Sequence, residues 1–144
     1  MIYFAYGMNT NNKQMAQRCP AAICLGVAVL PDWKFRFAGC ADIVPSPGGE
    51  VVGVLWNITE ECLDALDTLE GYPTFYTSSE LLVEWDGTTV YAEAYHMTPG
   101  NRDNLPSQGY LDMVLEGYKQ NGVPTEQVFQ SLKQLDRQAE FMYN

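Results

Sequence analysis

The sequence predicts an α+β fold with a curled, mainly antiparallel sheet. Segments with a strand pattern lie early and in the middle of the chain, whereas the few helical segments lie mostly late. Asp86-Gly87 separates two alternating runs and is a strong hairpin signal, which adds an antiparallel pair. This order favours α+β over a doubly wound parallel sheet. We expect residues 1–144 to form a single domain, because this length suits one domain with its own core.

Strands are predicted where apolar residues run together or alternate with polar ones. These segments are residues 1–6, 22–30, 33–37, 51–58, 79–85 and 89–97. Residues 42–50, DIVPSPGGE, are dense in proline and glycine, so we expect a loop there. Gly53 lies inside a predicted strand and indicates a bulge or a close approach of another segment.

Helical patterns occur in four segments, which are residues 9–18, 60–70, 107–121 and 124–136, and the first is a short polar helix or a turn. The second of them carries an apolar stripe of leucines, and Gly71 ends it. The third begins after a capping serine, Ser107, and closes at Gly122.

The charge balance is strongly acidic, with 18 Asp and Glu against 8 Lys and Arg, a net charge of −10. Nucleic acid is therefore not an expected partner. The start MIYFAYG lacks the basic and apolar regions of a signal peptide, and the longest apolar runs are too short to span a bilayer. We expect a cytoplasmic protein with no membrane association.

The cysteines and the histidine do not form a metal-binding pattern. Cys19, Cys24, Cys40 and Cys62 include no CxxC pair, and the only histidine is His96. Without a secretory signal, we expect all four thiols to be reduced. The sequence also lacks a G-x-S-x-G elbow, a GxGxxG loop and a Walker loop, so neither a metal nor a cofactor is expected.

One carboxylate stands out from the many on the surface. Glu70 ends an amphipathic helix, directly after a core leucine and just before Tyr72, Phe75 and Tyr76. Partial desolvation there would raise the pKa of the carboxyl group and make it a better base near neutral pH. The alternative is that Glu70 only ends the helix, with its charge in water.

A second candidate is the turn in the segment YFAYGMN. Gly7 follows the first predicted strand, and a glycine turn at this place can present backbone N–H groups to a carboxylate or phosphate. The alternative is an ordinary tight turn, which the local pattern taken alone favours.

Four motifs occur together in one order: YFAYGMN, PGGEVVGVLW, LDTLEGYPTFY and LPSQGY. The series resembles the γ-glutamylcyclotransferase family, including its γ-glutamylamine cyclotransferase relatives, over roughly residues 2–122. The resemblance implies an α+β domain built on a small mixed, mainly antiparallel β-barrel with flanking helices.

The resemblance also implies roles for the turn. In the family, a Tyr-Gly-Ser-Asn loop holds the γ-glutamyl part of the substrate through backbone N–H groups, and it matches Tyr6, Gly7, Met8 and Asn9 here. Met8 departs from the family's serine. A methionine is tolerated if only the backbone contacts the substrate, whereas affinity or substrate preference changes if the hydroxyl contributes.

The catalytic glutamate of the family matches Glu70, and Tyr76 and Tyr110 match two tyrosines of the substrate pocket. The implied reaction is cofactor-independent. The α-amine of a small γ-glutamyl amide attacks its own γ-carbonyl, which releases 5-oxoproline and a free amine or amino acid. Glu70 would take a proton from the α-ammonium and deliver one to the leaving amine.

Several alternatives stay open. The leaving group is not specified, and the acidic surface favours a cationic one, as in a γ-glutamylamine. A non-catalytic module on the same fold, which binds γ-glutamyl compounds or 5-oxoproline, is the rival class of function. The chain is expected to be a monomer or a homodimer.

Overall fold

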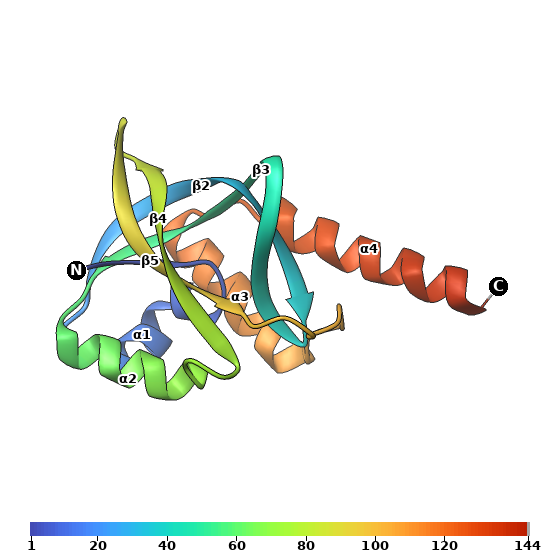
Figure 1. The fold of residues 1–144 in the computed structure, drawn as a ribbon, viewed down its shortest axis with the longest axis horizontal. Coiled ribbons are helices and arrows are strands. Elements are labelled where there is room, and N and C mark those ends of the chain that lie inside the picture. Colours follow the sequence, from blue (N-terminus) through green and yellow to red (C-terminus); the bar gives the residue numbers. More distant parts are fainter. Residues whose placement is uncertain (144) are drawn as a thin grey trace.

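A closed five-stranded barrel forms the centre of the protein (Figure 1). The computed structural model describes the backbone of residues 1–143 and the side chains of residues 1–137. The strands are β1 (Ile2–Ala5), β2 (Ile23–Ala38), β3 (Cys40–Asn57), β4 (Tyr76–Trp85) and β5 (Thr88–Met97). Their order around the barrel is β1-β3-β2-β4-β5, and every pair is antiparallel except β1 and β5. The predicted mixed, mainly antiparallel barrel is confirmed.

The helices lie outside the barrel (Figure 1). They are the 3₁₀ turn η1 (Met8–Thr10), α1 (Asn12–Arg18), α2 (Glu60–Glu70), α3 (Gln108–Asn121) and α4 (Glu126–Tyr143). Ser107 caps α3 and Gly122 closes it in a left-handed conformation, as predicted. The last helix runs beyond the predicted 124–136. None of the helices in the described part of the chain is long and apolar enough to cross a membrane.

The expectation of a loop at residues 42–50 is wrong, because this segment is the first half of β3. It pairs with β2 alone, so a proline nitrogen that faces away from β2 removes no ladder bond, and Pro47 lies in a stretch without a paired residue. The two strands predicted at 22–30 and 33–37 are one strand, β2, with an irregularity between Pro31 and Trp33. At this irregularity Asp32 takes a positive φ and its Oδ1 accepts a hydrogen bond from the N–H of Gly48 at 2.9 Å.

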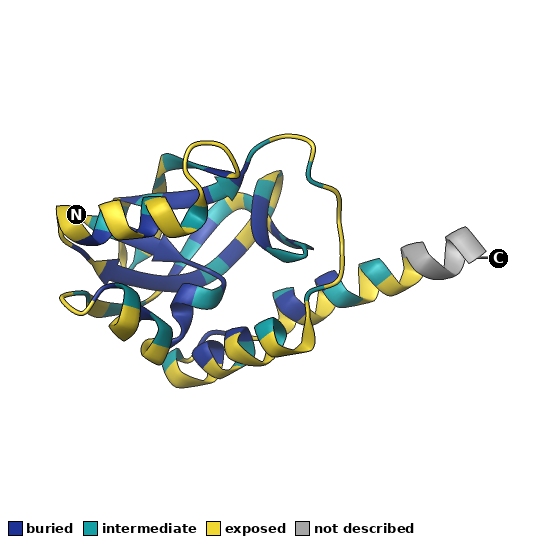
Figure 2. Ribbon diagram, turned by 90° about the horizontal axis from the view of Figure 1, so that it is seen from below, coloured by how far each residue is buried: buried dark blue, intermediate teal, exposed yellow. Residues whose placement is uncertain are grey.

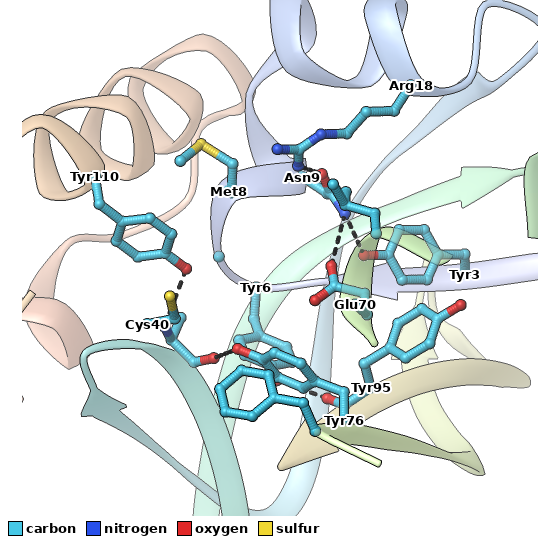
Figure 3. Close-up of a pocket in the computed structure, with 14 residues that line it drawn as sticks. Tyr3, Tyr6, Met8, Asn9, Arg18, Cys40, Glu70, Tyr76, Tyr95 and Tyr110 are labelled. Carbon is cyan, nitrogen blue, oxygen red and sulfur yellow. Dashed lines mark hydrogen bonds between the residues drawn. The ribbon is translucent and has the colours of Figure 1, made fainter. Parts of the chain in front are cut away.

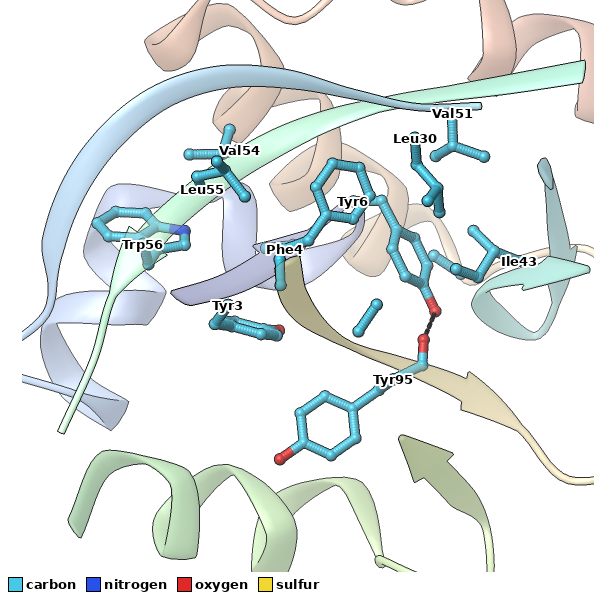
Figure 4. Packing of buried hydrophobic residues seen from close by; sticks show 14 of the residues in the cluster. Tyr3, Phe4, Tyr6, Leu30, Ile43, Val51, Val54, Leu55, Trp56 and Tyr95 are labelled. Atoms are coloured by element: carbon cyan, nitrogen blue, oxygen red, sulfur yellow. Dashed lines mark hydrogen bonds between the residues drawn. The ribbon is translucent and has the colours of Figure 1, made fainter. Parts of the chain in front are cut away.

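Gly53 marks a close approach, one of the two predicted possibilities. A Cβ atom there would lie 2.3 Å from the carbonyl oxygen of Ala5 and 2.7 Å from Cζ of Phe4. The missing side chain lets β1 lie close against its neighbour β3, and Phe4 packs in the core with Leu30, Val51 and Leu55 (Figure 4). Apolar burial of this kind is the dominant favourable term in folding.

Two cysteines form a disulfide, which corrects the expectation of four reduced thiols. Cys19, just after α1, is bonded to Cys62 in the first turn of α2, 43 residues away. Both residues are buried, whereas Cys24 and Cys40 are free thiols. The pairing depends on two helices that pack together in the fold, and no short-range spacing in the sequence signals it.

Candidate active site

A cavity of about 280 Å³ opens between the turn after β1, the last turn of α2, the start of β3 and the start of α3. All the residues that the sequence singled out for the site line it: Tyr6, Gly7, Met8, Asn9, Glu70, Tyr76 and Tyr110 (Figure 3). The volume suits a small molecule.

The turn after β1 is tightly packed at Gly7. A Cβ atom at this position would lie 2.9 Å from Cβ of Ala41 and 3.2 Å from Oη of Tyr110. The turn is closed by hydrogen bonds from the N–H groups of Thr10 and Asn11 to the carbonyl groups of Gly7 and Met8, at 3.1 and 3.0 Å. These bonds use the N–H groups at the end of the turn, and the N–H group of Met8 is directed at the hydroxyl of Tyr110.

Glu70 is the last residue of α2, because Gly71 turns the chain away with a φ of 65°. Its carboxyl group is half-buried, and Oε1 lies 3.5 Å from Nδ2 of Asn9. Burial raises the pKa of Glu70 from 4.5 to about 7, and the nearby Arg18 guanidinium opposes the rise. A carboxyl group of this kind can accept and return a proton near neutral pH.

Tyrosines wall the cavity, and several are anchored to the backbone. The hydroxyl of Tyr76 donates to the carbonyl of Ala41 at 2.7 Å, and the hydroxyl of Tyr110 accepts from the N–H of Ala41 at 3.0 Å. The hydroxyl of Tyr6 donates to the carbonyl of Tyr95 at 2.6 Å. Burial raises the pKa of Tyr6, Tyr76 and Tyr110 well above the ordinary value, so all three stay protonated.

The cavity also contains residues that sequence reasoning did not assign to the site. They include Tyr3, Arg18, Cys40 and Tyr95. Arg18 comes from the end of α1, and its guanidinium donates a hydrogen bond to Oδ1 of Asn9. Cys40 is the first residue of β3 and lies next to residues 42–50, where a loop was expected. Because this part of β3 was not predicted, Cys40 was not assigned to the site. Within the described residues, no cluster of three or more His, Cys, Asp or Glu is placed to hold a metal ion.

Comparison with known proteins identifies the family of the chain. Residues 3–113 match the family model described as "Gamma-glutamyl cyclotransferase, AIG2-like". The chain belongs to this γ-glutamyl cyclotransferase family. The resemblance seen in the four sequence motifs is thereby confirmed.

Individual members of the γ-glutamyl cyclotransferase family align over most of the chain. The protein named gamma-glutamylcyclotransferase in Bos taurus is 34% identical over 140 residues, covering 87% of this chain and 73% of the bovine protein. The Homo sapiens protein of the same name gives the same identity and coverage. A solved structure named gamma-glutamyl cyclotransferase superposes with a TM-score of 0.80 at 33% identity, over 88% of this chain and 82% of the other.

Proposed function

We propose that this protein is a γ-glutamyl cyclotransferase that converts a small γ-glutamyl amide into 5-oxoproline and a free amine or amino acid. The observation that carries the proposal is the position of Glu70. Its carboxyl group has a pKa of about 7 and lines a cavity beside the turn that matches the family's substrate loop. Membership in the family supports the same reaction class.

The reaction needs no group beyond the substrate and the protein. The α-nitrogen of the γ-glutamyl part forms a bond to the γ-carbonyl carbon, and the bond from that carbon to the leaving nitrogen breaks. Between its ammonium form and the lactam N–H the α-nitrogen loses two protons. Glu70 takes each in turn and passes it to the leaving nitrogen, which departs as an ammonium group. Holding the substrate in a folded conformation supplies much of the acceleration, because the attack is intramolecular.

The turn after β1 would hold the substrate. The N–H groups of Gly7, Met8 and Asn9 are proposed to bind its α-carboxylate or to polarise the γ-carbonyl. Tyr6 and Tyr76 would shape the walls, because their hydroxyl protons are already donated to backbone carbonyls. In Figure 3 the side chain of Met8 does not point at Glu70, which is compatible with a role for its backbone alone.

The charge of the cavity bears on the leaving group. The net charge of −10 favours a cationic amine, but a site is local, and Arg18 is the one basic side chain among the described residues that line the cavity. A guanidinium group repels an ammonium group and attracts a carboxylate. We therefore propose a leaving group that carries a carboxylate, as an amino acid does, ahead of a cationic amine.

The test is release of 5-oxoproline from γ-glutamyl-alanine, γ-glutamyl-ε-lysine and glutathione. The lysine released from γ-glutamyl-ε-lysine carries an ammonium group in addition to its carboxylate. Faster turnover of γ-glutamyl-alanine therefore supports both the reaction and the repulsion of a cation by Arg18. Preference for the lysine compound would keep the reaction and reject the role given to Arg18. Binding of 5-oxoproline without turnover of any compound would indicate a non-catalytic module, with Met8 the first residue to examine.

A further inference from the structure

Tyr3 is a buried tyrosine of the cavity that the mechanism above does not use. It lies on β1 with only 4% of its surface exposed, and it lines the cavity. Its ring packs edge-on against Tyr95, with the ring centroids 5.9 Å apart. This packing fixes the direction of the hydroxyl group, which points toward Asn9 and Glu70 in Figure 3.

The orientation of the Asn9 side-chain amide determines whether Tyr3 donates or accepts in their hydrogen bond. An arginine can only donate, so the bond from Arg18 requires that Oδ1 of Asn9 faces the guanidinium. Nδ2 of Asn9 then faces the other way, with Oη of Tyr3 at 3.0 Å and Oε1 of Glu70 at 3.5 Å (Figure 3). Tyr3 is therefore the acceptor in its bond with Asn9, and its own proton is not used there.

Three of the neighbouring tyrosines differ in this respect, whereas the hydroxyl of Tyr110 also acts as an acceptor, from the N–H of Ala41, at the side of the cavity formed by the start of α3. Tyr6, Tyr76 and Tyr95 donate their protons to a backbone carbonyl or, for Tyr95, to Oδ1 of Asp67 at 2.5 Å. Among the side chains and backbone groups of residues 1–137, none accepts the proton of Tyr3. A buried O–H donor without an acceptor costs free energy, and a bound ligand that offers an oxygen atom removes this cost.

We infer that the hydroxyl group of Tyr3 donates a hydrogen bond to the γ-carbonyl oxygen of the substrate and stabilises the oxyanion that forms there, an inference that rests on the proposed function. Tyr3 and Glu70 contact the same nitrogen atom of Asn9, so their oxygen atoms lie close together. Glu70 exchanges protons with the two nitrogens bonded to the reacting carbon, and the carbonyl oxygen is the remaining polar atom on that carbon. A neutral donor next to Glu70 is placed to reach it.

The chemistry of Tyr3 suits a donor and not a base. Burial raises the pKa of Tyr3 above the range of physiological pH, and the charge of Glu70 adds to the rise. The phenol therefore keeps its proton while charge develops on the substrate.

The test compares wild type with Tyr3→Phe, Glu70→Gln and Tyr91→Phe in the release of 5-oxoproline from the best substrate. Tyr91 is an exposed tyrosine of β5 that does not line the cavity, so Tyr91→Phe is a matched control. Loss of one oxyanion donor predicts that Tyr3→Phe lowers kcat roughly 100-fold, with little change in KM. The pH dependence of the residual activity keeps the apparent pKa of the wild type.

The outcomes separate the inference from the proposed function. If wild type releases no 5-oxoproline, both are overturned. If wild type is active and Glu70→Gln is not, a Tyr3→Phe variant with wild-type kcat overturns the inference alone. A rise in KM without loss of kcat, or a shift of the pH profile, would assign Tyr3 to binding or to positioning of Glu70 and would also overturn it.

A second measurement covers the case in which Tyr3→Phe does not fold. Incorporation of 3-fluorotyrosine at position 3 keeps the ring and the hydroxyl group but makes the phenol a stronger donor. A direct donor to the oxyanion predicts a change in kcat, whereas an unchanged kcat overturns the inference.

Discussion

The acid/base properties of Glu70 follow from its place at the end of a helix. The preceding residues of α2 pack on the barrel, and Gly71 reverses the chain, which leaves the carboxyl group half-buried between Asn9 and the cavity. Desolvation raises its pKa to about 7, whereas the guanidinium of Arg18 moderates the shift. The same two forces give a pH dependence that can be measured.

We predict that kcat/KM rises about tenfold per pH unit below pH 7 and levels off above it, because the base must be ionised to accept a proton. The apparent pKa should lie near 7, the value to which burial raises the pKa of Glu70. Removing the opposing charge with Arg18→Gln should move the profile to higher pH. A profile flat from pH 5 to 8 in wild type would contradict the role of Glu70.

Gly7 is predicted to tolerate no side chain. A Cβ atom would press on Ala41 and on the hydroxyl of Tyr110, so Gly7→Ala should lower the free energy of unfolding by about 1–3 kcal/mol and raise KM. The matched control is Gly109→Ala in the first turn of α3, where a Cβ atom meets nothing within 4 Å. Urea unfolding and steady-state kinetics of the two variants test this, and equal behaviour would contradict it.

Helix α2 is held at both ends, which keeps Glu70 in position. Thr59 caps its first turn, with Oγ1 accepting from the N–H of Cys62 at 3.2 Å. Cys62 is also bonded to Cys19, and Tyr95 donates to Asp67 one turn before Glu70. Arg18 directly precedes Cys19, so the disulfide joins the two helices that carry Arg18 and Glu70.

Reduction of the disulfide is predicted to destabilise the protein. A crosslink that closes a loop of this length contributes roughly 3–4 kcal/mol by restricting the unfolded chain. Urea unfolding with and without a reductant should show this difference in wild type and in Cys24→Ser, which leaves the bonded pair intact. The difference should vanish in Cys19→Ala/Cys62→Ala, and a reductant effect that survives in that variant would contradict the assignment.

The raised pKa of Glu70 should make the free energy of unfolding of the whole molecule depend on pH. Because the folded state holds the proton of Glu70 more tightly than the unfolded state, this group makes the free energy of unfolding fall as pH rises from about 4.5 to about 7. Glutamine does not titrate. The stability of Glu70→Gln relative to wild type should therefore increase over this range and stay constant above it, as measured by urea unfolding at several pH values. A pH-independent difference would contradict the raised pKa.

The parts of the fold that have local sequence signals, such as turns and helix caps, were predictable. The Asp86-Gly87 turn and the cap at Ser107 act over a few residues, and the structure has both. The predicted stripe of α2 is only partly correct, because Leu66 is buried, whereas Leu69, expected in the core, is 49% exposed and lines the cavity. The strand at residues 42–50 was not predictable from composition, because its prolines are accommodated by an unpaired edge that exists only in the fold.

The residues of the cavity were likewise predictable only in part. The four family motifs pointed to the turn after β1 and to Glu70, which the fold brings together across 61 residues. Arg18 and Tyr3 were not assigned, because their part in the site depends on the orientation of one amide, that of Asn9. The bond between Cys19 and Cys62 likewise depends on helix packing.

The most direct test is the rate of 5-oxoproline release by Glu70→Gln beside wild type, with Glu61→Gln as a control on the exposed first turn of the same helix. Loss of the general acid/base predicts a rate at least about 100-fold below wild type for Glu70→Gln, and a nearly unchanged rate for Glu61→Gln. A Glu70→Gln variant that folds and releases 5-oxoproline at the wild-type rate would contradict the proposed mechanism.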